Sequence, residues 1–267
     1  MTLSATQEAR QNELDRVLDG ATSVPASLPG ELFGVVDALG SASALRRALT
    51  DPAATVEAKA GLAHAVFDPK VSPQCASLVA AAAQLRWSSG GALVEALERQ
   101  AVRAQFILAR AAGSLDEASD GLFRFARVVE GDLALREAVA NPALPLERRR
   151  GLVEGLLADA DETVRALSSR AVDARHRTFS LTMEHYLRLA ADIRNRAIAK
   201  VTVARPMTDE QRTRMRAALI ALAGRDLDIQ EIVDPEVIGG VRVELGDEVV
   251  DGSVATRLED ARRRMAN

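Results

Sequence analysis

Apolar residues recur along most of the chain at the spacing of an α-helix. The apolar positions Leu122, Phe125, Ala126 and Val129 are separated by three, one and three residues, which places them on one helical face. The stretch 179–193 carries the same pattern further, with an apolar residue at every third or fourth position. We expect further helices over 92–112, after Asp132, after Pro145 and around Leu167. Most of the chain is therefore predicted to be helical.

The pattern changes after Arg196, where apolar and polar residues begin to alternate. Residues 199–203, 227–233 and 241–245 are predicted strands. Thr208 and Gln211 have the spacing of a capping box and predict a helix between the first two strands. Its apolar face is predicted to carry Met215, Ala218, Leu219 and Leu222. A two-residue turn at Gly246-Asp247 and a last helix from Ser253 to Met265 complete a small α/β unit.

The helical part contains an internal repeat. Residues 31–67 align without gaps on residues 121–157 at an offset of 90, with eleven of 37 positions identical. Residues 87–91 form a break between the copies, and the predicted helix over 92–112 belongs to both. The fold class is therefore predicted to be mainly α, with two tandem helical bundles that share a long helix, followed by a small α/β C-terminal domain. The predicted domains are 1–91, 92–195 and 196–267.

Composition fits closely packed helices, because aromatic residues make up only 3% of the chain and the core must come from Ala, Leu and Val. The net charge of −4 hides two opposite blocks: 165–216 carries twelve basic and five acidic residues, and 225–251 carries two basic and nine acidic ones. Such blocks either pair internally or face different partners, although solvated helix faces are their ordinary explanation.

The basic block raises the possibility of nucleic-acid binding, which favours arginines on one surface together with exposed aromatic rings. The nearby Phe179 and Tyr186 fall on the apolar helical stripe instead, and the sequence pI is 5.6. No nucleic-acid partner is therefore expected.

No motif supports catalysis, a cofactor or a metal site. His64, His176 and His185 lack metal-ligand spacing, and Cys75 is more simply a small buried residue than an activated thiol. The pair Gly239-Gly240 is not followed by the Lys-Ser/Thr of a phosphate loop, and the serine of Asp251-Gly252-Ser253 fits a helix cap better than a nucleophile. The chain has no secretory signal and no apolar run long enough to cross a bilayer, so direct membrane insertion is not expected.

The C-terminal strings resemble the delta subunit of bacterial F-type ATP synthases, the family of the mitochondrial oligomycin-sensitivity-conferring protein. The similar elements are VDP at 233–235, IGG-V at 238–241, the G-D turn at 246–247 and V-D-G-S at 250–253. The signature residues, taken as structural, are Asp234, Pro235, Gly239, Gly240, Gly246, Asp251, Gly252 and Ser253. The stretch 140–157 is similar to the family's helical domain, and residues 1–91 would make this an extended form with a duplicated bundle.

The resemblance implies a non-catalytic stator, or peripheral-stalk, subunit at the cytoplasmic face of the cell membrane. Its helical domain would receive N-terminal helices of alpha subunits in a groove, and its C-terminal part would hold the b-subunit stalk. Candidate groove residues are Phe106, Ile107, Arg110, Val164, Leu167 and Ala171. Core-facing and groove-facing apolar residues share one periodicity, so the sequence leaves both roles open for each. It also leaves open whether the first copy binds a helix or acts as a spacer. The alternative is a helical-repeat scaffold unrelated to ATP synthase, which would leave the C-terminal signature unexplained.

Overall fold

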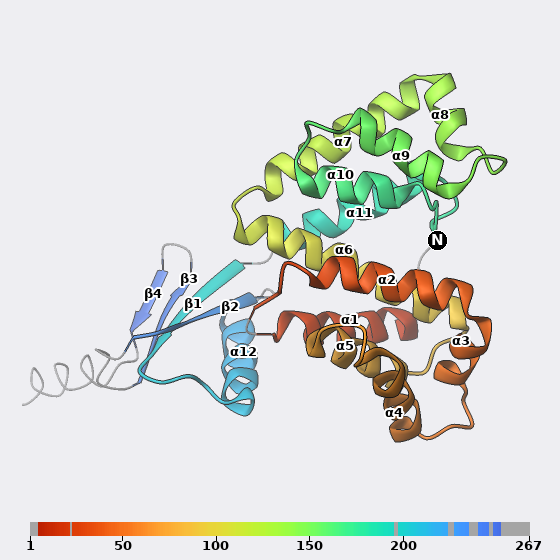
Figure 1. Cartoon of the computed structure of the whole chain (residues 1–267). Coiled ribbons are helices and arrows are strands. Elements are labelled where there is room, and N and C mark those ends of the chain that lie inside the picture. The colour runs from red at the N-terminus through yellow and green to blue at the C-terminus, as the bar shows by residue number, and fades with distance from the viewer. Residues whose placement is uncertain are drawn as a thin grey trace, which may run out of the picture. The chain divides into compact units, whose positions relative to one another are not determined.

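The computed structural model describes residues 5–21, 23–194, 197–223, 227–234, 240–245 and 248–251. Contacts divide the chain into two compact units, 1–193 and 194–267. The first is helical and the second contains a small sheet (Figure 1). The prediction of a mainly α chain with a small α/β C-terminal part is confirmed. The predicted domain limits within the helical part stay a prediction.

The helical unit contains the duplication that the sequence predicts. The first copy comprises α1 (Ala5–Asp19), α2 (Leu28–Ser41), α3 (Ser43–Thr50), α4 (Val56–Phe67), α5 (Pro73–Gln84) and α6 (Gly90–Ala111). The second adds α7 (Leu115–Gly131), α8 (Leu133–Ala140), α9 (Leu146–Leu156), α10 (Glu162–Ala171) and α11 (Phe179–Arg194). At the offset of 90, α3 coincides with α8 and α1 falls inside α6, so α6 closes the first bundle and opens the second.

Local signals set the helix ends. The Asp132 carboxylate accepts a hydrogen bond from the Leu135 backbone N–H at 2.9 Å and caps α8, as predicted. Ser72 and Ser89 cap α5 and α6 in the same way. Gly113 follows α6 with a φ of 77°, a left-handed conformation that lets the chain reverse into α7.

Each bundle has its own core, and α6 contributes to both. Its Leu93, Leu97 and Ala101 pack in the first core, whereas Val102 and Phe106 pack in the second. The first core is rich in alanine and leucine, which allows its helices to approach closely. The shared long helix is thereby confirmed.

The C-terminal unit is a four-stranded sheet with one described helix. Its elements are β1 (Ala197–Val203), α12 (Asp209–Ala223), β2 (Leu227–Val233), β3 (Val241–Leu245) and β4 (Glu248–Asp251). The strand order is β2-β1-β3-β4, with β1 and β2 parallel and the other pairs antiparallel. The helix α12 connects the parallel pair, as a crossover requires.

The predicted capping box is present, because the Thr208 N–H donates to Gln211 Oε1 at 2.9 Å and the Gln211 N–H donates to Thr208 Oγ1 at 3.3 Å. One detail of the predicted apolar face is wrong: Ala218 is exposed. The inward line of α12 passes through Met215, Leu219 and Ile220, so Ala218 lies beside it. The predicted turn at 246–247 and the predicted helix after Ser253 lie outside the described residues.

Candidate functional site

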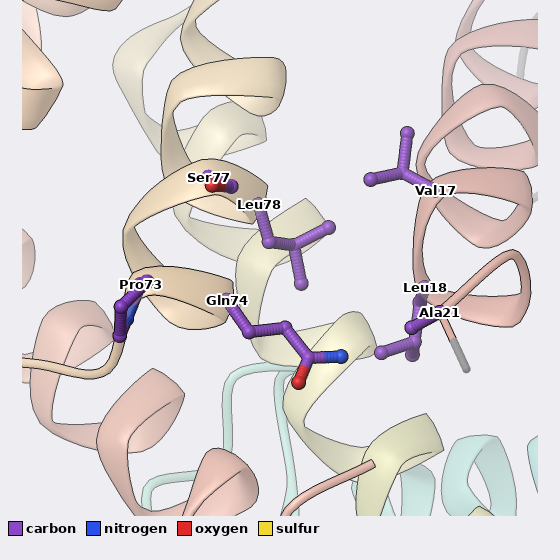
Figure 2. A pocket seen from close by; sticks show the side chains of 7 residues that line it. All are labelled: Val17, Leu18, Ala21, Pro73, Gln74, Ser77 and Leu78. Atoms are coloured by element: carbon purple, nitrogen blue, oxygen red, sulfur yellow. The ribbon is translucent and has the colours of Figure 1, made fainter. Parts of the chain in front are cut away.

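A groove opens between α1 and α5 of the first bundle. Its cavity of about 300 Å³ is lined by Val17, Leu18, Ala21, Pro73, Gln74, Ser77 and Leu78. Figure 2 shows Val17 and Leu18 on α1 facing Gln74 and Leu78 on α5 across the cavity. Val17 is 43% exposed although it is aliphatic, whereas Leu18 and Leu78 are buried. The groove therefore has an apolar floor and an accessible apolar rim.

Ion pairs with α6 hold the α1 wall of this groove. Asp15 Oδ2 lies 2.6 Å from Arg99 Nη2, and Asp15 Oδ1 accepts a hydrogen bond from Gln100 Nε2 at 2.7 Å. Arg103, which is fully buried, lies 3.2 Å from Asp15 and 2.9 Å from Asp19. Among the α1 side chains that the structure describes, only Leu14 and Leu18 lie in the core, so these charged contacts are a major part of its attachment.

The α5 wall is held at its first turn by a residue of α2. Glu31 accepts hydrogen bonds from the backbone N–H of Ser72, at 2.9 Å, and from the Ser72 hydroxyl. The same hydroxyl oxygen accepts a hydrogen bond from the Cys75 N–H and so caps α5. This arrangement fixes Gln74 and Leu78 at the groove.

Repeat symmetry relates this groove to the residues predicted from the sequence. At the offset of 90, Val17 corresponds to Ile107, Gln74 to Val164 and Ser77 to Leu167. The residues predicted from the sequence thus lie at the corresponding place in the second copy, and none of them lies in the first-copy groove. The duplication itself was the signal that could have found it.

In the second bundle the described positions equivalent to the groove are mostly buried, so no open groove is found among them. Phe106, Val164, Leu167 and Ala171 are buried in the second core, and only Ile107 and Arg110 are partly exposed. Arg110 Nη1 donates to the carbonyl oxygen of Ile193 at 3.2 Å. Gln105 Nε2 donates to Thr163 Oγ1 at 3.2 Å and bridges α6 to α10.

A glycine explains part of this closure. Gly121 of α7 takes the place of Glu31, and a Cβ atom built on it would lie 2.7 Å from Val164 Cγ2. The missing side chain lets α10 approach α7 and bury Val164. The two copies therefore present different surfaces at equivalent positions.

The described family-signature residues belong to the sheet of the C-terminal unit. The Asp234 N–H donates to the Val203 carbonyl at 2.9 Å directly after β2. Gly240 precedes β3 with a φ of 84°, a conformation that favours glycine. Asp251 ends β4 opposite Arg242. Pro235, Gly239, Gly246, Gly252 and Ser253 lie outside the described residues.

Of the titratable candidates from the sequence, Cys75 is buried, and His64, His176 and His185 are partly exposed. Burial, together with the charge of Glu31, raises the pKa of the Cys75 thiol to about 12, so this thiol stays protonated, as its predicted role as a small buried residue requires. Desolvation, together with the neighbouring charge of His176, lowers the pKa of His185 to about 3. The rings of these two histidines lie 4.0 Å apart, centroid to centroid. Over the described residues, no group of three or more His, Cys, Asp and Glu is placed to hold a metal ion.

The basic block is partly neutralised within the helical unit. Arg170 and Arg175 pair with Glu98 and Asp37, so these two arginines do not form a free cationic surface for nucleic acid. Within the described part of the chain, no helix has the length and apolar character needed to cross a membrane.

Known proteins resemble this chain over nearly its whole length. The model of the family described as ATP synthase delta (OSCP) subunit matches residues 97–265. The ATP synthase subunit delta of Streptomyces avermitilis is 42% identical, over 98% of this chain and 97% of the relative. The corresponding subunit of Streptomyces coelicolor is 41% identical, over 97% and 95%. That of Cutibacterium acnes is 39% identical, over 97% and 99%. These relatives match the first bundle as well, most of which the family model leaves out.

Proposed function

The chain belongs to the ATP synthase delta (OSCP) subunit family, and on this basis we propose that it links the alpha subunits of the catalytic head to the b-subunit stalk. As a delta subunit it is a non-catalytic component of a membrane-associated complex. In the proposed role it acts in the peripheral stalk, at the cytoplasmic face of the cell membrane. It keeps the head from turning with the rotor, so that proton-driven rotation is coupled to ATP synthesis.

The observation that carries the proposal is the open groove of the first bundle. An amphipathic helix binds by placing its apolar face between two helices of its receptor. The α1–α5 groove offers such a place, with Leu18 and Leu78 at its floor and the exposed Val17 at its rim. We propose that an N-terminal helix of an alpha subunit lies in it.

The residues predicted from the sequence form a second candidate site. Ile107 and Arg110 are its accessible part. The other four would become accessible only if α6 separated from α10, which would break the hydrogen bond between Gln105 and Thr163. In the structure as described, the first groove is therefore the stronger candidate.

The C-terminal unit offers an edge for the b subunit. The strand β2 lies at one edge of the sheet, and its Ile232 and Val233 are 41% and 46% exposed. An edge strand with exposed apolar side chains is a suitable contact for another chain. We propose that the end of the b subunit contacts this edge.

Calorimetric titration of an alpha-subunit N-terminal peptide into the full chain tests the groove. Val17→Asp places a charge at the apolar rim and should abolish most of the heat of binding. Val56→Asp is the matched control, because Val56 is similarly exposed, at 45%, but does not line the groove. Arg110→Ala tests the second candidate. Binding that survives Val17→Asp and disappears with Arg110→Ala would move the site to the second bundle.

A further inference from the structure

Six charged side chains meet where the two bundles join. We refer to them as the junction cluster; its members are Asp37, Glu98, Arg150, Arg170, Asp173 and Arg175. The three carboxylates and three guanidinium groups balance in charge. Arg170 and the carboxylates of Glu98 and Asp173 are almost completely buried. Such a set is stable in a low-dielectric site only while its members remain paired.

The cluster connects parts of both bundles through Arg170. This side chain of α10 donates from Nη2 to Glu98 of the shared helix at 2.9 Å and from Nη1 to Asp37 of α2 at 2.7 Å. Its guanidinium carbon also lies 4.9 Å from the ring centroid of Phe33 on α2. One second-bundle arginine therefore contacts the shared helix and the first bundle together.

Glu98 is the central acceptor. Its carboxylate accepts from Arg170, from Tyr186 Oη at 2.9 Å, and pairs with Arg175 Nε at 2.6 Å. Arg150 completes the cluster through Asp173, at 2.8 Å. These bonds are directional, so rotation of one bundle against the other would break them.

Comparison of the two copies shows that the cluster belongs to the junction. At the offset of 90, the first-copy counterparts of Arg150, Arg170, Asp173 and Arg175 are Ala60, Ala80, Ala83 and Leu85. All four are apolar, although α4 and α5 of the first copy correspond to α9 and α10 of the second. A bundle of this kind therefore folds without these four charges, which occur only in the second copy.

The loop after α10 is held in an unusual backbone conformation. Ala174 has a φ of 51° and Arg177 a φ of 80°, in the left-handed region that residues with side chains seldom adopt. Such a conformation persists where surrounding contacts fix it. Here it places Arg175 against Glu98. The first-copy equivalents of Ala174 and Arg177 are Gln84 and Trp87, and neither of these described residues has a positive φ.

We propose that the junction cluster is a conformational lock that fixes the angle between the two bundles. Apolar contacts alone are non-directional and tolerate sliding, whereas the paired arginines define one orientation. The lock would make the helical unit one rigid arm and hold the first-bundle groove at a set distance from the second bundle. This inference does not depend on what occupies the groove.

Distance measurement between the bundles tests the lock. Spin labels at Ala58→Cys and Arg148→Cys occupy exposed equivalent positions on α4 and α9, and the buried Cys75 stays unlabelled in the folded chain. Pulsed electron paramagnetic resonance on the full chain should give one narrow distance distribution. Asp37→Asn and Glu98→Gln should broaden it or add a second peak while circular dichroism stays unchanged.

Glu184→Gln is the matched control, because it removes a carboxylate from the exposed pair with Arg188 on α11, and neither residue belongs to the junction cluster. This variant should keep the narrow distribution. Asp37 is 44% exposed, so its variant should fold and decide the result even if Glu98→Gln does not fold. A parent distribution that is already broad, or an unchanged width in every folded junction variant, would overturn the proposal.

Discussion

Replacing Asp15 with alanine should release α1 from the helical unit and so open one wall of the groove. From residues 7–19 of this helix, only Leu14 and Leu18 lie in the buried core, which corresponds to roughly 3–6 kcal/mol of apolar burial at about 1.5–3 kcal/mol for each side chain. Asp15 is itself almost fully buried and interacts with Arg99, Gln100 and Arg103. We therefore expect the charged contacts and the apolar contacts to contribute similar free energies to the attachment of α1.

The expected effect follows from the arginines that remain. Removal of one partner of a buried ion pair costs about 3–5 kcal/mol, because the other charge stays desolvated and unpaired. This loss is comparable to the apolar attachment of α1, so we expect local detachment of the helix before global unfolding. A loss of about 3 kcal/mol corresponds to roughly 100-fold faster amide exchange in α1, since about 1.4 kcal/mol equals a factor of ten.

Hydrogen exchange measured by mass spectrometry on the full chain is the appropriate assay. Exchange should accelerate in 5–19 of the Asp15→Ala variant and stay nearly constant in α7–α11. Asp68→Ala is the control, because Asp68 forms an exposed pair with His64, and such pairs contribute about 0–1 kcal/mol. Unchanged exchange of α1 in Asp15→Ala would refute the reasoning and show that Leu14 and Leu18 alone hold the helix.

Three further results are expected. Gly121→Ala should destabilise the chain by about 1–3 kcal/mol, because the new methyl group contacts Val164, and adding Val164→Ala should relieve this cost. Urea unfolding measures both effects, and a double variant whose loss of unfolding free energy equals the sum of the two single losses would contradict the packing described. The folded-state pKa of His185, about 3, lies below the ordinary 6.5, so the unfolded chain binds more protons between these values. The free energy of unfolding is therefore not reduced by this group above pH 6.5, and it falls with decreasing pH, by about 2 kcal/mol at pH 5. The His185→Gln variant should show a smaller slope of the free energy of unfolding against pH. Cys75, with its pKa raised to about 12 by burial, should react with a maleimide only after the chain unfolds, and rapid labelling of the native chain would contradict its burial.

The elements that the sequence predicts well are those fixed by local chemistry. The cap at Asp132 and the capping box at Thr208 involve bonds across three residues, so they are visible in a short stretch of sequence. The strands β2 and β3 have the predicted limits because alternation and flanking turn residues are local signals too. The duplication extended this success, since one copy predicts the helices of the other.

The candidate site was harder to predict, because burial depends on neighbours distant in the sequence. Phe106 and Leu167 have the periodicity of groove residues, yet other helices of the second bundle cover them completely. Arg170 belongs to the basic block of the sequence, for which internal pairing is one of two alternatives, and its partners Glu98 and Asp37 lie 72 and 133 positions away. Counting charges in a local window cannot detect such pairs.

Removal of the subunit from a membrane preparation of the ATP synthase tests the central claim most directly. ATP-driven proton transport and ATP hydrolysis are measured in parallel, before and after the full chain is added back. The stator role predicts that proton transport is lost while the detached head still hydrolyses ATP, and that the added chain restores transport. Proton transport that stays coupled to hydrolysis without the subunit would contradict the proposed function.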